Sequence, residues 1–365
     1  MFDHRHYVPI VKWRQGEYQA LWKLSADVKD NITPLLEIPE EAWDFEAGAP
    51  KKTLDEHTEK FGKRLKEKWG GRRCLIDSCY LSPVATCANG EHHLSRLISL
   101  AEAEGCNVVP VTGLSRHMDY QKAVLGVTSE YKRGICLRLV ADDYDRSDLK
   151  GDITELLDYF SLSATDVDLV IDSKEFVPNS AVTYAITMLG FLGNTPYINR
   201  WRSLTVSGTA FPATINAVNY RPNGRAKRFE WLGYKNLIGR LNDKDRIPSF
   251  SDYTVSHPQT GNLDPRLMDP NAKIKYTVED DWFIVVGSQV KKNGRSQYRS
   301  HCDQIVNAIP KVFDGEKFSW GDLYIYECST AQGTATTGGT STWPSVTNNH
   351  HITRVVYELS NLYVI

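Results

Sequence analysis

Two short apolar runs with an amphipathic segment between them decide the fold. Residues 73–78 read Arg-Cys-Leu-Ile-Asp-Ser, residues 107–112 read Asn-Val-Val-Pro-Val-Thr, and both runs are typical of buried strands. The segment between them, 92–104, places apolar side chains on one helical face, namely Leu94, Leu97, Ile98 and Ala101. A strand, a helix and a second strand in this order predict a βα unit with parallel strands.

The same alternation extends outward through the first two thirds of the chain. Further strands are predicted at 7–11, 32–38, 134–140, 167–172, 202–207 and 250–255. Further helices are predicted at 53–69, 116–127, 148–161 and 179–191. Eight strands, each followed by a helix or helical stretch, favour an α/β fold of the TIM-like (β/α)8 barrel type over an open doubly wound sheet.

The pattern changes after about residue 256. A β-hairpin is predicted at about 273–290, a helix at 296–309 and a flexible loop at about 331–342. Asn348 or Asn349 is expected to cap a final amphipathic helix. We therefore predict one barrel domain over residues 1–365, with 257–347 as an insertion before the final helix.

Composition restricts the class of protein. The chain has 365 residues, 41% hydrophobic and 24% charged, with a formal net charge of -2, which excludes a disordered or fibrous chain and a global attraction to nucleic acid or anionic lipid. No signal peptide and no membrane-spanning run is evident, and seven scattered cysteines without a CxxC motif suggest reduced thiols. We expect a cytoplasmic protein with no membrane partner.

Polar residues at the carboxyl ends of the predicted strands are the main candidate site, because the mouth of a βα barrel is built there. They are Lys12, Glu37, Asp77, Arg138, Asp172 and Asp252. Two strands end alike, Leu75-Ile-Asp-Ser78 and Val170-Ile-Asp-Ser173, and strand alternation turns each acid away from its apolar neighbour.

Three interpretations of this mouth are open. Glu37, Asp77 and Asp172 would hold Mg²⁺ or Mn²⁺ while Lys12 and Arg138 contact a phosphate, as in a phosphodiesterase or nuclease. The same groups would otherwise form buried ion pairs that organise the end of the barrel. A third interpretation is a sensor that binds a nucleotide or other small ligand without turnover. No other cofactor is predicted.

Other candidates lie outside the strand ends. His350, from the pair His350-His351, is a candidate to act alone in catalysis, and helix capping is its structural alternative. Glu230 is expected beside the mouth. Four basic residues followed by aromatic ones would track a nucleic-acid backbone or form a solvated loop, namely Arg221, Arg225, Lys227 and Arg228. Neither a GxSxG nucleophile elbow nor a phosphate-binding P-loop motif occurs.

Several segments resemble the phage beta protein family. They are Tyr7-Val-Pro-Ile-Val-Lys-Trp-Arg-Gln-Gly-Glu-Tyr-Gln-Ala-Leu, Ile32-Thr-Pro-Leu-Leu-Glu-Ile-Pro, Phe211-Pro212, Arg228-Phe-Glu-Trp231, Asp252-Tyr253, Tyr276-Thr277, Phe318-Ser-Trp-Gly-Asp322 and His350-His351. The resemblance implies a protein of prophages, satellite phages and bacterial defence loci. It also implies a toxic protein partner encoded nearby, which this chain would bind and restrain in anti-phage defence.

Overall fold

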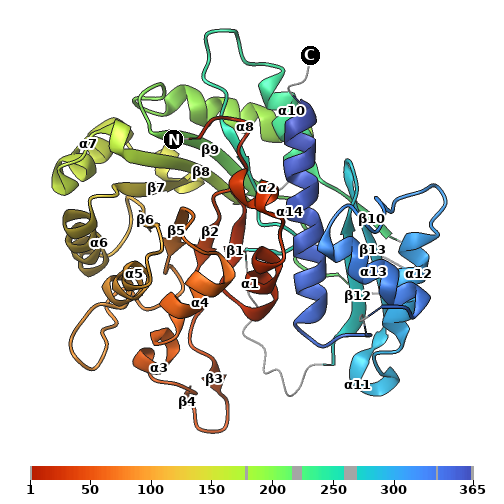
Figure 1. Cartoon of the computed structure of the whole chain (residues 1–365). Helices are drawn as coiled ribbons and strands as arrows, with labels where there is room; N and C mark the ends of the chain where they lie inside the picture. The colour runs from red at the N-terminus through yellow and green to blue at the C-terminus, as the bar shows by residue number, and fades with distance from the viewer. Residues whose placement is uncertain (1, 177–179, 216–223, 259–268, 334–335, 363–365) are drawn as a thin grey trace.

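Eight parallel strands form the centre of the molecule (Figure 1). The computed structural model describes residues 2–176, 180–215, 224–258, 269–333 and 336–362. The strands, in the order in which they are hydrogen-bonded, are β1 (Ile10–Lys12), β2 (Leu35–Glu37), β5 (Cys74–Asp77), β6 (Val108–Thr112), β7 (Ile135–Val140), β8 (Val167–Glu175), β9 (Ser203–Thr209) and β11 (Ser249–Ser251). Each overlaps a predicted strand.

The sheet closes on itself. Tyr7, just before β1, forms a parallel bridge with Phe250 of β11. The amide of Val8 donates to the Phe250 carbonyl at 3.0 Å, and the amide of Ile10 donates to the Asp252 carbonyl at 2.8 Å. The predicted α/β barrel of the TIM-like type is therefore confirmed.

The strands are apolar on both faces because both faces are covered. Leu35, Leu75 and Val109 fill the barrel interior together with the other members of one buried cluster. Their neighbours Leu36 and Ile76 face outward and join the larger core beneath the helices. This strict alternation fixes which strand-end residues point into the mouth.

Helices surround the barrel. They are α1 (Gln15–Trp22), α2 (Ala26–Asp30), α3 (Leu54–Thr58), α4 (Phe61–Lys68), α5 (His93–Ala103), α6 (Met118–Tyr131), α7 (Leu149–Phe160), α8 (Ala181–Asn194) and α10 (Phe229–Ile238). Short elements join them, namely the strands β3 (Trp43–Asp44) and β4 (Ala49–Pro50) and the 3-10 helices η1 (Ala141–Asp145) and η2 (Ala164–Asp166). The segment predicted as one helix at 53–69 is two helices, interrupted at Glu59 and Lys60.

Close packing of α4 on α5 depends on a glycine. A Cβ atom built on Gly62 would lie 2.0 Å from the carbonyl oxygen of Leu100, so a side chain there would push the two helices apart. Phe61 and Leu65 of α4 are buried in the main core on the same face. The amphipathic pattern of this segment therefore covers the barrel as predicted.

A second, smaller sheet lies beside the barrel (Figure 1). Its antiparallel strands, in spatial order, are β10 (Gly224–Lys227), β13 (Asp281–Gln289) and β12 (Asn271–Thr277). The helices α11 (Val290–Asn293), α12 (Gln297–Val306) and α13 (Trp320–Thr330) follow. The predicted hairpin and helix are confirmed, whereas β10 lies in the segment for which either a nucleic-acid-binding stretch or a solvated loop was predicted, and no strand.

The last helix, α14 (Thr342–Leu362), joins the two parts. Its Val346 packs in the core of the smaller sheet, while Ile352, Val355 and Leu359 belong to the core of the barrel. In Figure 1 it stands between α1 and the smaller sheet, at the place of the eighth barrel helix. The division into one domain with an insertion at 257–347 remains a prediction.

The prediction for the start of this helix is wrong. α14 begins at Thr342, so Asn348 and Asn349 lie inside it and do not cap it. Asn349 instead joins neighbouring helices, because its amide donates to the Ala20 carbonyl at 3.1 Å and accepts from the Gly321 amide at 2.9 Å. Of the loop predicted at 331–342, residues 334–335 lie outside the described residues, and Thr342 is already helical.

Candidate functional site at the barrel mouth

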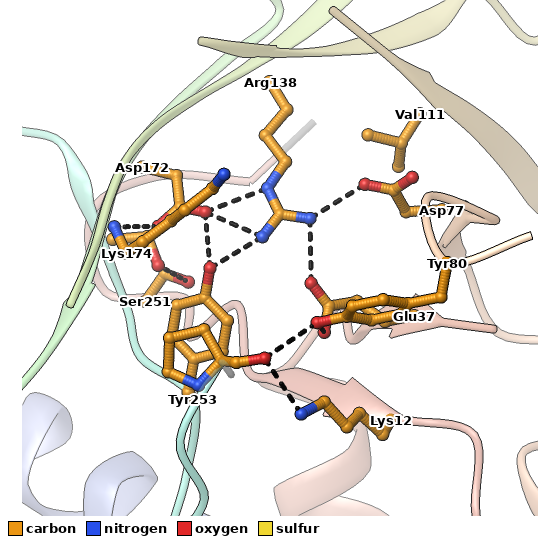
Figure 2. Close-up of polar contacts among 12 residues, drawn as sticks. Lys12, Glu37, Asp77, Tyr80, Val111, Arg138, Asp172, Lys174, Ser251 and Tyr253 are labelled. Carbon is orange, nitrogen blue, oxygen red and sulfur yellow. Dashed lines mark hydrogen bonds and ion pairs between the residues drawn. The ribbon is translucent and has the colours of Figure 1, made fainter. Parts of the chain in front are cut away.

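Arg138 occupies the centre of the barrel mouth (Figure 2). β7 directs its side chain inward because Leu137 and Leu139 on either side face the helices. The guanidinium donates to Asp172 Oδ2 through Nε at 2.9 Å and through Nη2 at 2.7 Å. Its Nη1 donates to Glu37 Oε1 at 2.9 Å and to Asp77 Oδ2 at 2.8 Å. One cation thus joins carboxylates from three strands.

A second layer of contacts holds these carboxylates. Arg116, in the loop after β6, donates from Nη2 to both Asp77 oxygens at 2.9 Å. The Lys174 amide donates to Asp172 Oδ1 at 2.9 Å. Tyr253 accepts from Arg138 Nη2 at 2.7 Å and donates to Asp172 Oδ2 at 2.6 Å. The three acids are therefore ion-paired, as the second of the interpretations above requires.

Charge and burial explain the ionisation of this network. Burial acts to raise the pKa of Asp77, but Arg116 and Arg138 outweigh it and hold that pKa below its ordinary value. Burial raises the pKa of Glu37 despite Arg138. Burial opposes the charge of Arg138, yet the surrounding tyrosine and acids keep its pKa well above the ordinary value.

The carboxylates do not form a metal-ligand set. Arg138 lies among Glu37, Asp77 and Asp172 and takes up the oxygens that a divalent cation would use. Within the described ranges, no group of three or more His, Cys, Asp or Glu side chains is arranged to hold a metal ion. The donor set thus does not fit the predicted Mg²⁺ or Mn²⁺.

A cavity of about 550 Å³ opens above the network. Arg116 and Arg138 line it with Lys174, Tyr80 and other loop residues. The Arg116 side chain is 22% exposed, and in the described part of the chain its Nε and Nη1 make no hydrogen bond, since both contacts to Asp77 come from Nη2. The guanidinium also lies over the Tyr120 ring, 5.2 Å from its centre, so Arg116 lines the cavity with two nitrogens that have no hydrogen-bond partner among the described residues.

Lys12 lies at the rim and pairs with no carboxylate in the part of the chain that the structure describes. Its Nζ donates to the carbonyls of His257 at 3.0 Å and Pro258 at 3.1 Å, and it lies 5.6 Å from the centre of the Tyr80 ring. Burial lowers its pKa. Tyr80 donates in turn to Glu37 Oε2 at 3.2 Å (Figure 2).

Asp252 does not face the mouth. Tyr253 points inward at this strand end, so Asp252 points outward toward α14. It accepts hydrogen bonds from Tyr7 Oη and from the Thr254 amide, and His351 Nε2 lies 3.0 Å from its Oδ2. The prediction that Asp252 lies with the mouth acids is wrong, because the residue that points into the mouth at this position is its neighbour Tyr253.

His350 lies away from the mouth, buried beside the smaller sheet. Its Nδ1 is 2.9 Å from Asp322 Oδ2 and its Nε2 is 2.7 Å from the Thr277 carbonyl oxygen. Both partners are acceptors, so both ring nitrogens donate and the imidazole is cationic. Burial opposes this charge, but Asp322 outweighs burial and raises the pKa of His350. The contacts support a structural role.

Glu230 is buried near the end of β9 and does not line the mouth cavity. Its Oε2 accepts from the Ala210 amide at 3.1 Å, while its Oε1 has no partner among the described residues. Burial and the nearby Asp252 raise the pKa of Glu230 to about 8. The carboxyl therefore carries its proton near neutral pH.

The four predicted basic residues do not form one exposed patch. Arg225 and Lys227 both pair with Asp281, at 3.3 and 2.8 Å. Arg228 is fully buried and donates to Glu358 at 2.8 Å, so it cannot contact a phosphate backbone. Arg221 lies outside the described residues. The structure thus gives no support to the predicted nucleic-acid surface.

Sequence reasoning missed four side chains of the mouth, namely Tyr80, Arg116, Lys174 and Tyr253. Three of them follow a predicted strand by two to four residues, so the loops after the strands carried the missing signal. A larger cavity, of about 790 Å³, is lined by the N-terminal segment, α2 and α14 and by none of the strand-end residues.

No helix of the described ranges is long and apolar enough to cross a membrane.

Comparison with known proteins identifies the family of this chain. A search of curated proteins gave no match. A family model described as Beta protein matches residues 7–357, nearly the whole chain. The chain therefore belongs to the Beta protein family.

Proposed function

We propose that this beta-family protein is a cytoplasmic binding protein whose barrel mouth recognises a small anionic ligand. One observation carries the proposal: Arg116, whose Nε and Nη1 have no hydrogen-bond partner among the described residues, lines a cavity of about 550 Å³ together with Arg138 and Lys174. Guanidinium groups pair bidentately with phosphate and carboxylate groups, and ligand cavities typically measure about 300–1,000 Å³.

The carboxylates of the mouth favour binding over catalysis. Glu37, Asp77 and Asp172 are each held by Arg138, so none is free to take a proton or to coordinate a metal. We therefore give the phosphodiesterase or nuclease activity second place.

The ligand-binding experiment uses inorganic phosphate and citrate as probes in titration calorimetry. We expect the affinity for at least one probe to fall about tenfold or more in Arg116→Gln and in Lys174→Ala, because each removes a cation from the cavity wall. Lys150→Ala, an exposed lysine of α7 outside the cavity, is the matched control and should bind like the wild type. Absence of binding of both probes, or equal binding by all variants, contradicts the proposal. Manganese-dependent release of nitrophenol from bis(p-nitrophenyl) phosphate by the wild type would favour the enzyme instead.

The biological role we propose is restraint of a toxic protein partner in anti-phage defence. The resemblance to proteins of prophages and defence loci supports this role. Co-expression with the product of the neighbouring gene should yield a complex that co-purifies, and should relieve the toxicity of that product. If the neighbouring gene product inhibits growth equally with and without this chain, the proposed restraint is contradicted.

A further inference from the structure

A second cleft lies between the barrel and the smaller sheet. It consists of two cavities of about 280 and 290 Å³. They share four lining residues, namely Glu17, Ser256, Lys273 and Lys275. Because Lys273 and Lys275 project from β12, the smaller sheet supplies the common wall of both cavities. The two cavities therefore adjoin along one strand.

The cleft is strongly cationic. The lining residues of the two cavities include Lys12, Arg14, Lys273, Lys275 and Arg295, against the single acid Glu17. None of these cations forms a salt bridge within the described ranges, in contrast to the arginines of the barrel mouth. Uncompensated positive charge in a cavity is the arrangement that attracts an anion.

The surroundings of Lys275 disfavour its charged form. Its Nζ donates to the Val255 carbonyl at 2.7 Å and lies 4.6 Å from the centre of the Phe211 ring. Burial and the neighbouring Lys273 lower the pKa of Lys275 to about 7. A bound anion would stabilise its charged form.

The other end of the cleft is different in character. Tyr298 and Trp343 line it, with ring centres 4.4 Å apart in a stacked pair, and Val290 and Pro344 add apolar surface. Asn348 of α14 also lines this end and is 1% exposed. Its Oδ1 has no hydrogen-bond partner in the described part of the chain. Such a buried acceptor calls for a donor.

The geometry points to a nucleoside phosphate as the ligand of this cleft, with its phosphates beside Lys273 and Lys275 and its base at the end lined by Tyr298, Trp343 and Asn348. Lysines bind phosphates as point charges, and flat bases bind against aromatic and apolar walls. An exocyclic amino group of a base is the donor that Asn348 Oδ1 lacks. This cleft shares no lining residue with the mouth cavity, although Lys12 at the rim of the mouth also lines the cleft, and the inference does not depend on the function proposed for the mouth.

Titration calorimetry with ATP, tripolyphosphate and adenosine tests the inference. We expect ATP to bind most tightly, because only ATP occupies both ends of the cleft. Lys273→Met and Lys275→Met should each weaken ATP binding about tenfold or more, and methionine keeps the apolar stem of the lysine. Lys292→Ala, an exposed lysine of α11, is the matched control and should bind as the wild type does.

Two further variants separate the alternatives. Asn348→Ala should weaken ATP binding without changing that of tripolyphosphate, and Lys174→Ala at the barrel mouth should change neither. ATP binding that is absent, or that is unchanged in both methionine variants, would overturn the inference. Loss of ATP binding in Lys174→Ala alone would move the site to the mouth. Tripolyphosphate binding as tight as that of ATP would overturn the assignment of a base.

Discussion

At the scale of single residues, Arg138 decides the character of the barrel mouth. A side chain that is 6% exposed donates to three carboxylates from three different strands. Removing a buried charge from such a network leaves its partners uncompensated, which is far more costly than losing a surface ion pair.

We expect Arg138→Leu to lower the free energy of unfolding by about 3–5 kcal/mol, because the buried Glu37 and Asp172 lose their ion pair and Asp77 keeps only Arg116. Urea denaturation followed by circular dichroism measures the change. The control is Arg200→Leu at an exposed position, which should stay within about 0.5 kcal/mol of the wild type. A loss of under 1 kcal/mol for Arg138→Leu would show that the network contributes little to stability.

Glu230 makes stability depend on pH. Its folded-state pKa is about 8 against an ordinary value of 4.5, so the folded chain keeps a proton that the unfolded chain releases. Stability is then fully present below pH 4.5 and is lost as the pH rises through 8. Glu230→Gln removes this loss, so we expect its stability relative to the wild type to increase between pH 5 and pH 8, on the order of 2–4 kcal/mol.

Thermal unfolding of both proteins across this pH range measures the difference. Glu155→Gln, at an exposed site on α7, is the matched control and should follow the wild type at every pH. A constant difference between Glu230→Gln and the wild type across the range would contradict the assigned protonation.

At the scale of elements, two strand ends share one device. The carboxylate of Asp172 accepts from the Lys174 amide, and that of Asp252 accepts from the Thr254 amide, in each case two residues on. Lys174 and Thr254 both have left-handed backbone conformations, with φ of 54° and 56°. At Lys174 the turn forms a bulge near the end of β8, since Glu175 pairs again with Thr209 of β9, whereas after β11 the same turn directs the chain into the loop above the barrel.

Lys174 allows the turn to be tested because its side chain is exposed. Lys174→Gly should keep or slightly raise stability, by up to about 0.5 kcal/mol, because glycine adopts a positive φ without steric cost. Lys174→Val should lower it by about 1–2 kcal/mol, since a β-branched residue is strained there. Chemical denaturation of the two variants provides the comparison, and equal stabilities would contradict the strained turn.

The sequence predicted elements best where periodicity is strong. Each barrel strand and most helices follow from alternating apolar runs, and so do the inward directions of Glu37, Asp77 and Asp172. Asp252 failed because β11 reads Ser-Phe-Ser, with Phe250 turned outward and small polar residues turned inward, so apolarity does not reveal its inner face. The ion pair between Arg116 and Asp77 was not predicted either, because it depends on the conformation of the loop after β6.

Two other misses have local causes. The final helix begins at Thr342, before the predicted cap at Asn348 or Asn349, and Pro344 lies in its first turn, where the missing amide hydrogen costs nothing. β10 is a short edge strand of mixed polarity whose partner β13 is more than 50 residues away in sequence. Local pattern carries no information on such a pairing.

At the scale of the whole molecule, α14 connects the two hydrophobic cores, because it contributes residues to both. Its amino-terminal half packs with β12, α12 and α13, and also with α1, through Pro344 beside Gly16 and Asn349 beside Ala20. Its apolar residues Ile352, Val355 and Leu359 join the core of the barrel. A helix shared in this way couples the unfolding of the barrel to that of the smaller sheet.

We expect a single cooperative transition in differential scanning calorimetry, with equal calorimetric and van't Hoff enthalpies. Val346→Ala and Ile352→Ala remove buried methyl groups on the two sides of α14, and each should lower the midpoint of the same transition, by several degrees. The exposed Tyr357→Ala on the same helix is the control. Two separate transitions, each shifted by only one of these variants, would show two independent domains and contradict the predicted single domain.

The contact between α1 and α14 also affects how the protein folds during its synthesis. The first helix leaves the ribosome early, but the segment that covers it is among the last to be synthesised. The apolar surface that α14 covers on the nascent barrel therefore stays exposed to solvent or chaperones until translation is nearly complete. A premature stop codon between β11 and α14 would release a chain that retains all eight barrel strands but lacks the helix that covers α1.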